Sequence, residues 1–218
     1  MGLGKIDAGH LLEAVRDIAY IVDPAGCILA CAAESWRRFA GANGAPRLAD
    51  PSKVVGALLY DAITGEETRD SYRRFAELLL ERKREAVSFP YRCDAPEIRR
   101  EMRMTISPIV VKGQAVALLY QSQALLEQSR PAMNIFRAPL AVTGVGGPPI
   151  VAICSYCKNV RFPAGEPMGE WIPPERYYQR GGSESVVLSH SICPVCYENI
   201  VQPALGELRE RLPAGRRR

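Results

Sequence analysis

Two short apolar runs near the start of the chain, residues 18–22 and 27–31, are separated by a turn-forming segment. That segment, Asp23-Pro-Ala-Gly, has proline and glycine at positions that suit a type I turn. We therefore expect the two runs to pair as a β-hairpin. Helices are predicted on either side of the hairpin, over residues 7–15 and, with an amphipathic pattern, over residues 34–40.

A longer helix is predicted over residues 65–84, where apolar side chains recur at spacings of three and four and charged side chains fill other positions. Thr64 and Glu67 stand three residues apart at its start, which is the spacing of a capping box. In that arrangement each of the two side chains accepts a hydrogen bond from a backbone N–H group at the start of the helix.

Three further strands are predicted after this helix, over residues 87–92, 101–106 and 115–121. The middle one alternates between apolar and polar side chains, which is the period of a half-buried strand. Two strands, helices and then three strands predict an α+β domain, in which helices cover a five-stranded antiparallel sheet. Three arginines in this region are expected on the solvated face of a strand: Arg99, Arg100 and Arg103.

Two segments of this region, AYIVDPAGCILACAAESWRRFAG and VSFPYRCDAPEIRREMRMTISPI, resemble the opening and closing parts of a PAS domain. The resemblance covers residues 8–125 and implies a PAS-like fold that senses a small molecule or binds a protein. It names no ligand, because the chain lacks the Asn-Cys-Arg-Phe-type motif of flavin-binding members. Neither histidine, His10 or His190, stands where haem-binding members place theirs. PAS domains often pair, so the resemblance also suggests a homodimer.

Proline, glycine and alanine are concentrated between residues 126 and 150, which predicts a linker. The chain is therefore expected to divide into a PAS-like sensor domain (8–125), this linker (126–150), a cysteine-rich module (151–202) and a basic tail (203–218).

Four of the seven cysteines form two Cys-x-x-Cys pairs in the third of these parts, Cys154 with Cys157 and Cys193 with Cys196. Each pair can direct two thiolates at one ion, and zinc takes four such ligands in a tetrahedron. The 35 residues between the pairs exceed the roughly 15–20 that are common in zinc ribbons, so the insert must fold against the site. The sequence therefore predicts a small zinc-ribbon-like, metal-binding module.

His190 is a fifth candidate ligand, and a closed zinc site uses only four. We favour the four cysteines as ligands, with His190 hydrogen-bonded to a thiolate or to the backbone. Three cysteines with His190 form the alternative set. Four cysteines also fit an iron–sulfur cluster, and the sequence does not choose between the two metals.

The segments ICSYCKNVR, EWIPPERYY and LSHSICPVCYENI resemble a small cysteine-rich module at the C-terminal end of bacterial sensory proteins. In that family the module follows PAS, GAF or receiver domains. The resemblance covers about residues 151–200 and implies signal transduction, without naming a ligand or a partner.

Composition and motifs further limit the classes of protein that fit the sequence. The 28 basic and 24 acidic residues leave a net charge of +4, which is too small to indicate nucleic-acid binding. No apolar run is long enough to cross a membrane and the start does not resemble a secretory signal, so a cytoplasmic protein is expected. No hydrolase, metalloprotease or nucleotide-binding motif is present, so we expect no enzymatic activity.

Three functions fit these observations. The first is a non-catalytic bacterial signalling protein, whose PAS-like domain is coupled to a structural zinc module that docks to a signalling partner. The second is a redox or iron sensor with an iron–sulfur cluster on the same cysteines. The third is nucleic-acid binding through the cysteine module and the arginines at the end of the tail.

Overall fold

The computed structural model describes residues 8–43, 45–137 and 148–210. Parts of the predicted linker (126–150) and of the basic tail (203–218) lie outside these residues. None of the helices in the described part of the chain has the length and apolar character that a membrane crossing requires.

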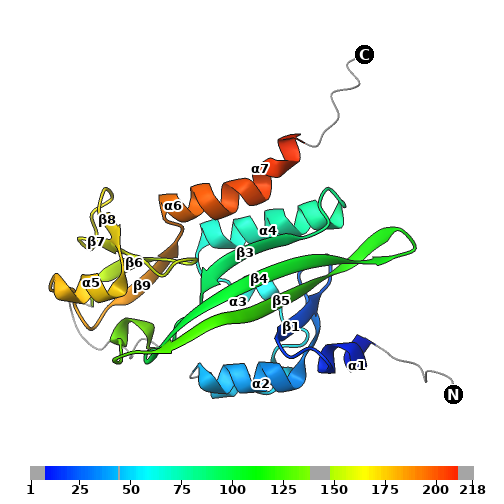
Figure 1. Ribbon diagram of the computed structural model, residues 1–218, viewed down its shortest axis with the longest axis horizontal. Helices are drawn as coiled ribbons and strands as arrows, with labels where there is room; N and C mark the ends of the chain where they lie inside the picture. Colours follow the sequence, from blue (N-terminus) through cyan, green and yellow to red (C-terminus); the bar gives the residue numbers. More distant parts are fainter. Residues whose placement is uncertain (1–7, 44, 138–147, 211–218) are drawn as a thin grey trace, which may run out of the picture.

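The larger sheet has five antiparallel strands in the order β2-β1-β5-β4-β3 (Figure 1). This arrangement confirms the α+β class and the five-stranded antiparallel sheet expected from the sequence. Its strands are β1 (Ile18–Val22), β2 (Ile28–Cys31), β3 (Val87–Arg92), β4 (Ile98–Val111) and β5 (Gln114–Ser129). The last two strands run well beyond their predicted ends, because they form one long hairpin whose backbone pairing continues past the buried residues.

Helices flank this sheet, as the order of helical and strand segments along the sequence predicts (Figure 1). They are α1 (Ala8–Glu13), α2 (Ala33–Ala42), α3 (Leu59–Ala62) and α4 (Glu66–Leu80), with single 3-10 turns at Pro46–Leu48 and Pro51–Lys53. The long helix α4 ends four residues before the predicted Arg84. Arg82 adopts a φ of 55°, and the N–H of Lys83 donates to the carbonyl of Leu78, a pattern that closes helices.

Aromatic side chains fill the space between this sheet and its helices. The rings of Tyr20 and Tyr120 stack at a centroid distance of 5.1 Å, and those of Phe75 and Phe89 lie 5.6 Å apart. Met102, Met104 and Ile106 face the interior, in keeping with the alternation that predicted their strand.

The prediction that the arginines of β4 share a solvated face is wrong for Arg100. Arg100 is 1% exposed, whereas Arg103 lies on the exposed side of the strand. The Arg100 guanidinium ion-pairs with Glu127 at 2.6 Å and donates to Oδ1 of Asn43 and to the carbonyl of Cys93. A buried charge is tolerated here because all these partners surround it.

A smaller, four-stranded sheet follows in the order β8-β7-β6-β9. Its strands are β6 (Ile150–Cys154), β7 (Val160–Phe162), β8 (Glu170–Ile172) and β9 (Val187–Ser191). A 3-10 turn (Asn134–Phe136) precedes it, α5 (Pro174–Gln179) lies within it, and α6 (Pro194–Cys196), a π-helical turn (Tyr197–Val201) and α7 (Gln202–Glu210) follow it. Strands β6 and β9 pair in parallel, so the long insert brings the two Cys-x-x-Cys segments to the same end of the sheet.

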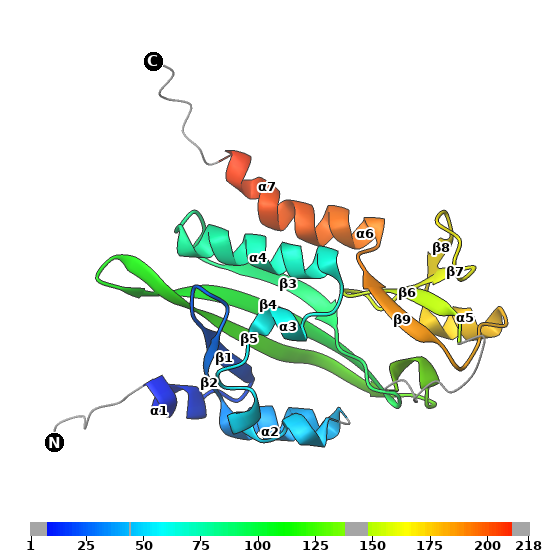
Figure 2. The same cartoon turned by 180° about the vertical axis from the view of Figure 1, so that it is seen from behind.

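The cysteine turns join the hydrophobic core of the larger sheet, while the rest of the smaller sheet has a core of its own around Val151, Ile153 and Val160. Cys154, Tyr156 and Cys193 lie in the same buried cluster as Phe75 of α4 and Phe89 of β3. Helix α7 runs alongside α4 in both views (Figures 1 and 2). The cysteine-rich segment is therefore packed against the PAS-like part of the chain.

Candidate metal centre

The four cysteines of the two pairs converge at one point. The Sγ atoms of Cys154, Cys157, Cys193 and Cys196 all lie within 4.8 Å of one another. Three of these residues are buried, with Cys154 0%, Cys193 2% and Cys196 6% exposed, and Cys157 is partly exposed. The arrangement fits a metal site with four sulfur ligands.

Each pair lies on a tight turn that directs its sulfurs inward. After β6, the N–H of Lys158 donates to the carbonyl of Cys154 at 3.0 Å, and Lys158 takes a φ of 62° to complete this turn. In the second pair, the N–H of Cys196 donates to Sγ of Cys193 at 3.4 Å. The N–H of Cys193 donates to Sγ of Cys154 at the same distance, so backbone donors already face two of the sulfurs.

The sulfurs also perturb one another electrostatically. Hydrogen bonds from Cys157, Cys193 and Cys196 lower the pKa of Cys154. The contact with Cys154 is the main cause that raises the pKa of Cys157, and it likewise raises that of Cys196. Without a metal, the cluster therefore favours a thiolate at Cys154 and thiols at Cys157 and Cys196. A divalent cation would replace those protons, as metal binding to thiols generally does.

His190, the fifth candidate ligand, is not a member of this four-sulfur group. It lies on β9, where it pairs with Ile153 of β6. Its Nδ1 atom is buried and has no hydrogen-bond partner among the described residues. The structure thus brings the four predicted cysteines together and places His190 beside them.

The first turn of α4 contacts both Cys-x-x-Cys segments. Oγ1 of Thr68 donates to Oγ of Ser155, inside the first pair, at 2.7 Å. Oε2 of Glu67 accepts hydrogen bonds from Oγ of Ser191 at 2.7 Å and from the N–H of Ile192 at 3.1 Å, just before the second pair. The long helix of the PAS-like part therefore holds the two metal-binding segments side by side.

These contacts overturn the predicted capping box. The residue before the first turn of α4 is Gly65, and no side chain caps the helix. The carboxylate of Glu67 is instead directed at a segment more than 120 residues further along the chain. Local spacing could not reveal that use, because Ser191 and Ile192 reach Glu67 only through the tertiary fold.

Tyr156 anchors the first pair to the core of the larger sheet. It lies between the two cysteines of that pair, is 2% exposed, and packs its ring edge-on against Phe89 at 5.5 Å. Sequence reasoning did not single it out. A large aromatic residue between two metal-ligand candidates was the available signal, since such a side chain needs a buried partner.

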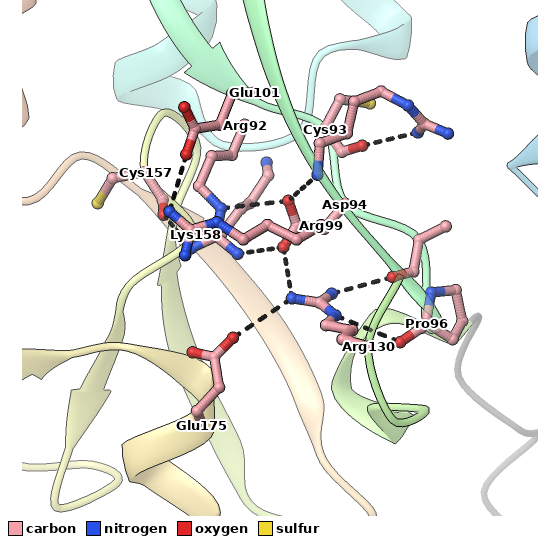
Figure 3. Close-up of polar contacts among 12 residues, drawn as sticks. Arg92, Cys93, Asp94, Pro96, Arg99, Glu101, Arg130, Cys157, Lys158 and Glu175 are labelled. Atoms are coloured by element: carbon pink, nitrogen blue, oxygen red, sulfur yellow. Dashed lines mark hydrogen bonds and ion pairs between the residues drawn. The ribbon is translucent and has the colours of Figure 1, made fainter. Parts of the chain in front are cut away.

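A buried polar network joins the β3–β4 turn to the cysteine segments (Figure 3). The backbone N–H of Arg92 donates to the carbonyl of Tyr156 at 2.7 Å, and its Nη1 donates to the carbonyl of Cys157 at 3.2 Å. The carboxylate of Asp94, fully buried, ion-pairs with Arg92 and with Arg130. Arg130 also reaches Glu175 of α5 at 3.5 Å, so the network spans both sheets.

A pocket of about 360 Å³ opens at the surface of the PAS-like part, between α2 and strands β4 and β5. Its lining includes Phe39, Arg100, Met102 and Ser122. Arg100 connects this pocket to the polar network, because its guanidinium donates to the carbonyl of Cys93 while its backbone N–H donates to Asp94 at 3.3 Å. A small molecule bound there would contact a residue that touches the network.

A scan against models of known protein families and a search of curated proteins returned no match. Solved structures similar to the chain include the PAS domain of Bordetella pertussis BvgS, at 14% identity and a TM-score of 0.42, over 55% of this chain and 85% of that chain. The PAS domain of an HTR-like protein from Haloarcula marismortui is similar at 15% identity and a TM-score of 0.36, over 53% and 86%. Vibrio cholera VqmA, in a complex with ligand and DNA, matches at 11% identity and a TM-score of 0.40, over 53% and 48%. These similarities concern the fold, over about half of this chain.

Proposed function

We propose that this chain is a non-catalytic signal-transduction protein, in which a PAS-like sensing domain is coupled to a structural zinc module. The observation that carries the proposal is the position of the four sulfurs. They lie within 4.8 Å of one another and in the same hydrophobic core as the long helix of the PAS-like part. A change in either part therefore has a short physical route to the other.

The spacing of the sulfurs favours a single ion. A zinc ion with Zn–S bonds of about 2.3 Å separates its sulfurs by about 3.8 Å, the edge of a regular tetrahedron. The Sγ atoms of Cys157 and Cys193 are 3.7 Å apart, which matches that edge. An iron–sulfur cluster, the alternative on the same cysteines, contains several metal atoms and requires a wider cage of sulfurs.

The sensing role rests on the pocket beside Arg100 and on the contacts that lead away from it. The route passes from Arg100 to the carbonyl of Cys93 and the carboxylate of Asp94, and from Asp94 through Arg92 to the carbonyl of Cys157. We expect a small molecule in the pocket to alter the position of Arg100 and so the β3–β4 turn. The zinc module would present that change to a signalling partner.

The first test is metal content with cysteine variants. Anaerobically purified protein is expected to contain about one zinc ion per chain and to be colourless. Cys154→Ser and Cys196→Ser are each expected to lose the zinc and to loosen residues 148–210. Cys27→Ser, which changes a cysteine outside the cluster, serves as the matched control and should retain the zinc.

Each outcome of this experiment has a clear meaning. Iron with sulfide and a brown colour would replace the structural zinc site by an iron–sulfur sensor. Protein without any metal, or full zinc content in both cluster variants, would refute the proposed centre.

A further inference from the structure

A groove of about 510 Å³ lies between α4 and the helical segment that follows the second cysteine pair. The two helices run side by side in both views (Figures 1 and 2). One wall is a stripe on the first turns of α4, formed by Glu67, Asp70, Ser71 and Arg74. The other wall comes from α6, the π-helical turn and α7, and consists of Pro194, Tyr197, Glu198, Val201 and Leu205. We call this site the α4–α7 groove.

The second wall of the groove carries apolar side chains at several depths. Val201 is 1% exposed and lies at the bottom of the groove, whereas Tyr197 is 46% exposed. Val195, the neighbour of Pro194 in the chain, is 65% exposed. Exposed apolar side chains gathered at a groove are typical of surfaces that bind other proteins.

The walls of the groove favour a helix over an extended peptide. The backbone N–H and C=O groups of a helix are bonded within that helix, so two helical walls offer few backbone partners to an extended chain. A third helix instead fits its ridges of side chains between two neighbouring helices. Residues 194–205 extend over about 16 Å at about 1.5 Å per residue, which is the length of three helical turns.

Two acids of the groove have no cationic partner among the described residues. Oε2 of Glu67 accepts hydrogen bonds from the hydroxyl of Ser191 and the N–H of Ile192, which are uncharged groups. Glu198 is exposed and forms no ion pair within the described part of the chain. Both carboxylates are therefore available to a positively charged partner.

The remaining charges of the groove are paired with each other's neighbours. Asp70 accepts from Arg73 at 3.2 Å, and Arg74 donates to Glu77 at 2.7 Å. Each of these exposed pairs is neutral as a whole. The two unpaired acids therefore set the sign of the charge, and the groove is complementary to lysine and arginine side chains.

We infer that the α4–α7 groove docks an amphipathic helix of a protein partner. The apolar stripe of that helix packs on Tyr197 and Val201, and its basic side chains pair with Glu67 and Glu198. The inference rests on the proposed function, because it names the kind of partner that the cysteine-rich module contacts. Since Glu67 also holds the segment before the second cysteine pair, a helix bound here touches both parts of the chain.

The probe for this site is a peptide of about 14 residues made of leucine and lysine, with the leucines at helical spacing, which is about 21 Å long as a helix. A control peptide has the same composition in alternating order, so its leucines do not share one face of a helix. Binding of each labelled peptide to the full chain is measured by fluorescence anisotropy, with zinc content determined on the same samples. We expect saturable binding of the first peptide at one site per chain, and at least about tenfold weaker binding of the control.

Three variants locate the site. Glu198→Lys reverses a charge of the groove and is expected to weaken binding of the helical peptide by at least about tenfold. Tyr197→Ala removes an exposed part of the wall and should weaken it by about fivefold. Both side chains are exposed, so we expect these variants to fold and to retain zinc. Glu166→Lys makes the same change of charge in the loop between β7 and β8 and should leave binding unchanged.

Three results would overturn the inference: no saturable binding of the helical peptide, equal binding of the alternating peptide, or equal affinities of Glu198→Lys and Glu166→Lys. Two further results would assign the groove to another occupant. Peptide binding that requires removal of residues 211–218 would assign it to the basic tail. A chain that sediments as a dimer, and as a monomer after Glu198→Lys, would assign it to a second copy.

The zinc measurement separates this inference from the proposed function. A chain that contains no zinc would refute the metal centre, and the peptide titration of the same sample would still decide the groove. Zinc-loaded protein that does not bind the helical peptide would leave the metal centre in place and refute the docking site alone.

Discussion

Gly65 meets two separate demands at the start of α4. Its φ of 91° belongs to the left-handed region, which side chains other than glycine rarely adopt. An added Cβ atom would also lie 2.7 Å from the carbonyl oxygen of His190, on β9 of the other sheet. Gly56 has a similar φ of 88° but open space around it. Comparing the two positions therefore distinguishes the cost of backbone strain from the cost of a steric clash.

Substituting alanine at both positions tests that distinction. Gly56→Ala should cost about 1 kcal/mol of unfolding free energy, from the left-handed backbone alone. Gly65→Ala should cost about 2–4 kcal/mol, because the backbone of His190 must also move away. Urea unfolding of both variants measures the difference. Equal losses would mean that the contact between α4 and β9 is looser than the structure indicates.

Arg100 shows what could and could not be predicted from the sequence about a single residue. The alternation that places Met102, Met104 and Ile106 inside also places residue 100 on that face, and Arg100 is indeed buried. Its charge favoured the prediction of a solvent-exposed position, because an arginine is almost never fully buried without partners. Those partners, Asn43 and Glu127, come from distant parts of the chain and cannot be recognised from local spacing.

At the scale of elements, α4 is the piece of the PAS-like part that meets the candidate metal centre. Periodic apolar positions predicted this helix correctly, because its buried face follows the 3.6-residue repeat. The same pattern could not indicate that its first turn would lie against both Cys-x-x-Cys segments. That docking depends on polar contacts of Glu67 and Thr68, which leave no periodic signal.

Glu67→Ala tests whether this turn holds the second cysteine pair. It removes the acceptor for Ser191 and for the N–H of Ile192, and it should speed hydrogen exchange at Ile192 by about tenfold. Glu66→Ala, at the neighbouring exposed position, is the matched control and should leave that exchange unchanged. Identical exchange rates at Ile192 in the two variants would show that Glu67 does not hold the second cysteine pair against α4.

On the scale of the whole molecule, the sequence predicted the five-stranded sheet and a small zinc-ribbon-like module. It did not predict that the cysteine turns of this module would join the hydrophobic core of the larger sheet. The resemblances treated residues 8–125 and 151–200 as successive units, because each has its own local pattern. The two units are held together by contacts between side chains that are distant in the sequence, such as Tyr156 and Phe89. The four cysteines of the candidate site followed from spacing alone, because two Cys-x-x-Cys pairs carry their chemistry in the sequence itself.

Removing the metal should therefore affect more than the cysteine-rich segment. After zinc is extracted with a chelator, we expect faster hydrogen exchange in residues 148–210 and also in α4 and β3. Amides near Ala19 should keep their protection, because Ala19 packs with Leu12 and Ala32 in a separate cluster. Faster exchange confined to residues 148–210 would show that the shared core does not couple the two parts.

The unequal burial of the four sulfurs also bears on the kinetics of the centre. Cys157 is partly exposed, whereas Cys154, Cys193 and Cys196 are buried. A chelator or oxidant in solution therefore meets Cys157 first, and it reaches the other three sulfurs only when the fold opens locally. Loss of the ion from the folded protein then takes two steps, attack at Cys157 and local opening around the three buried cysteines.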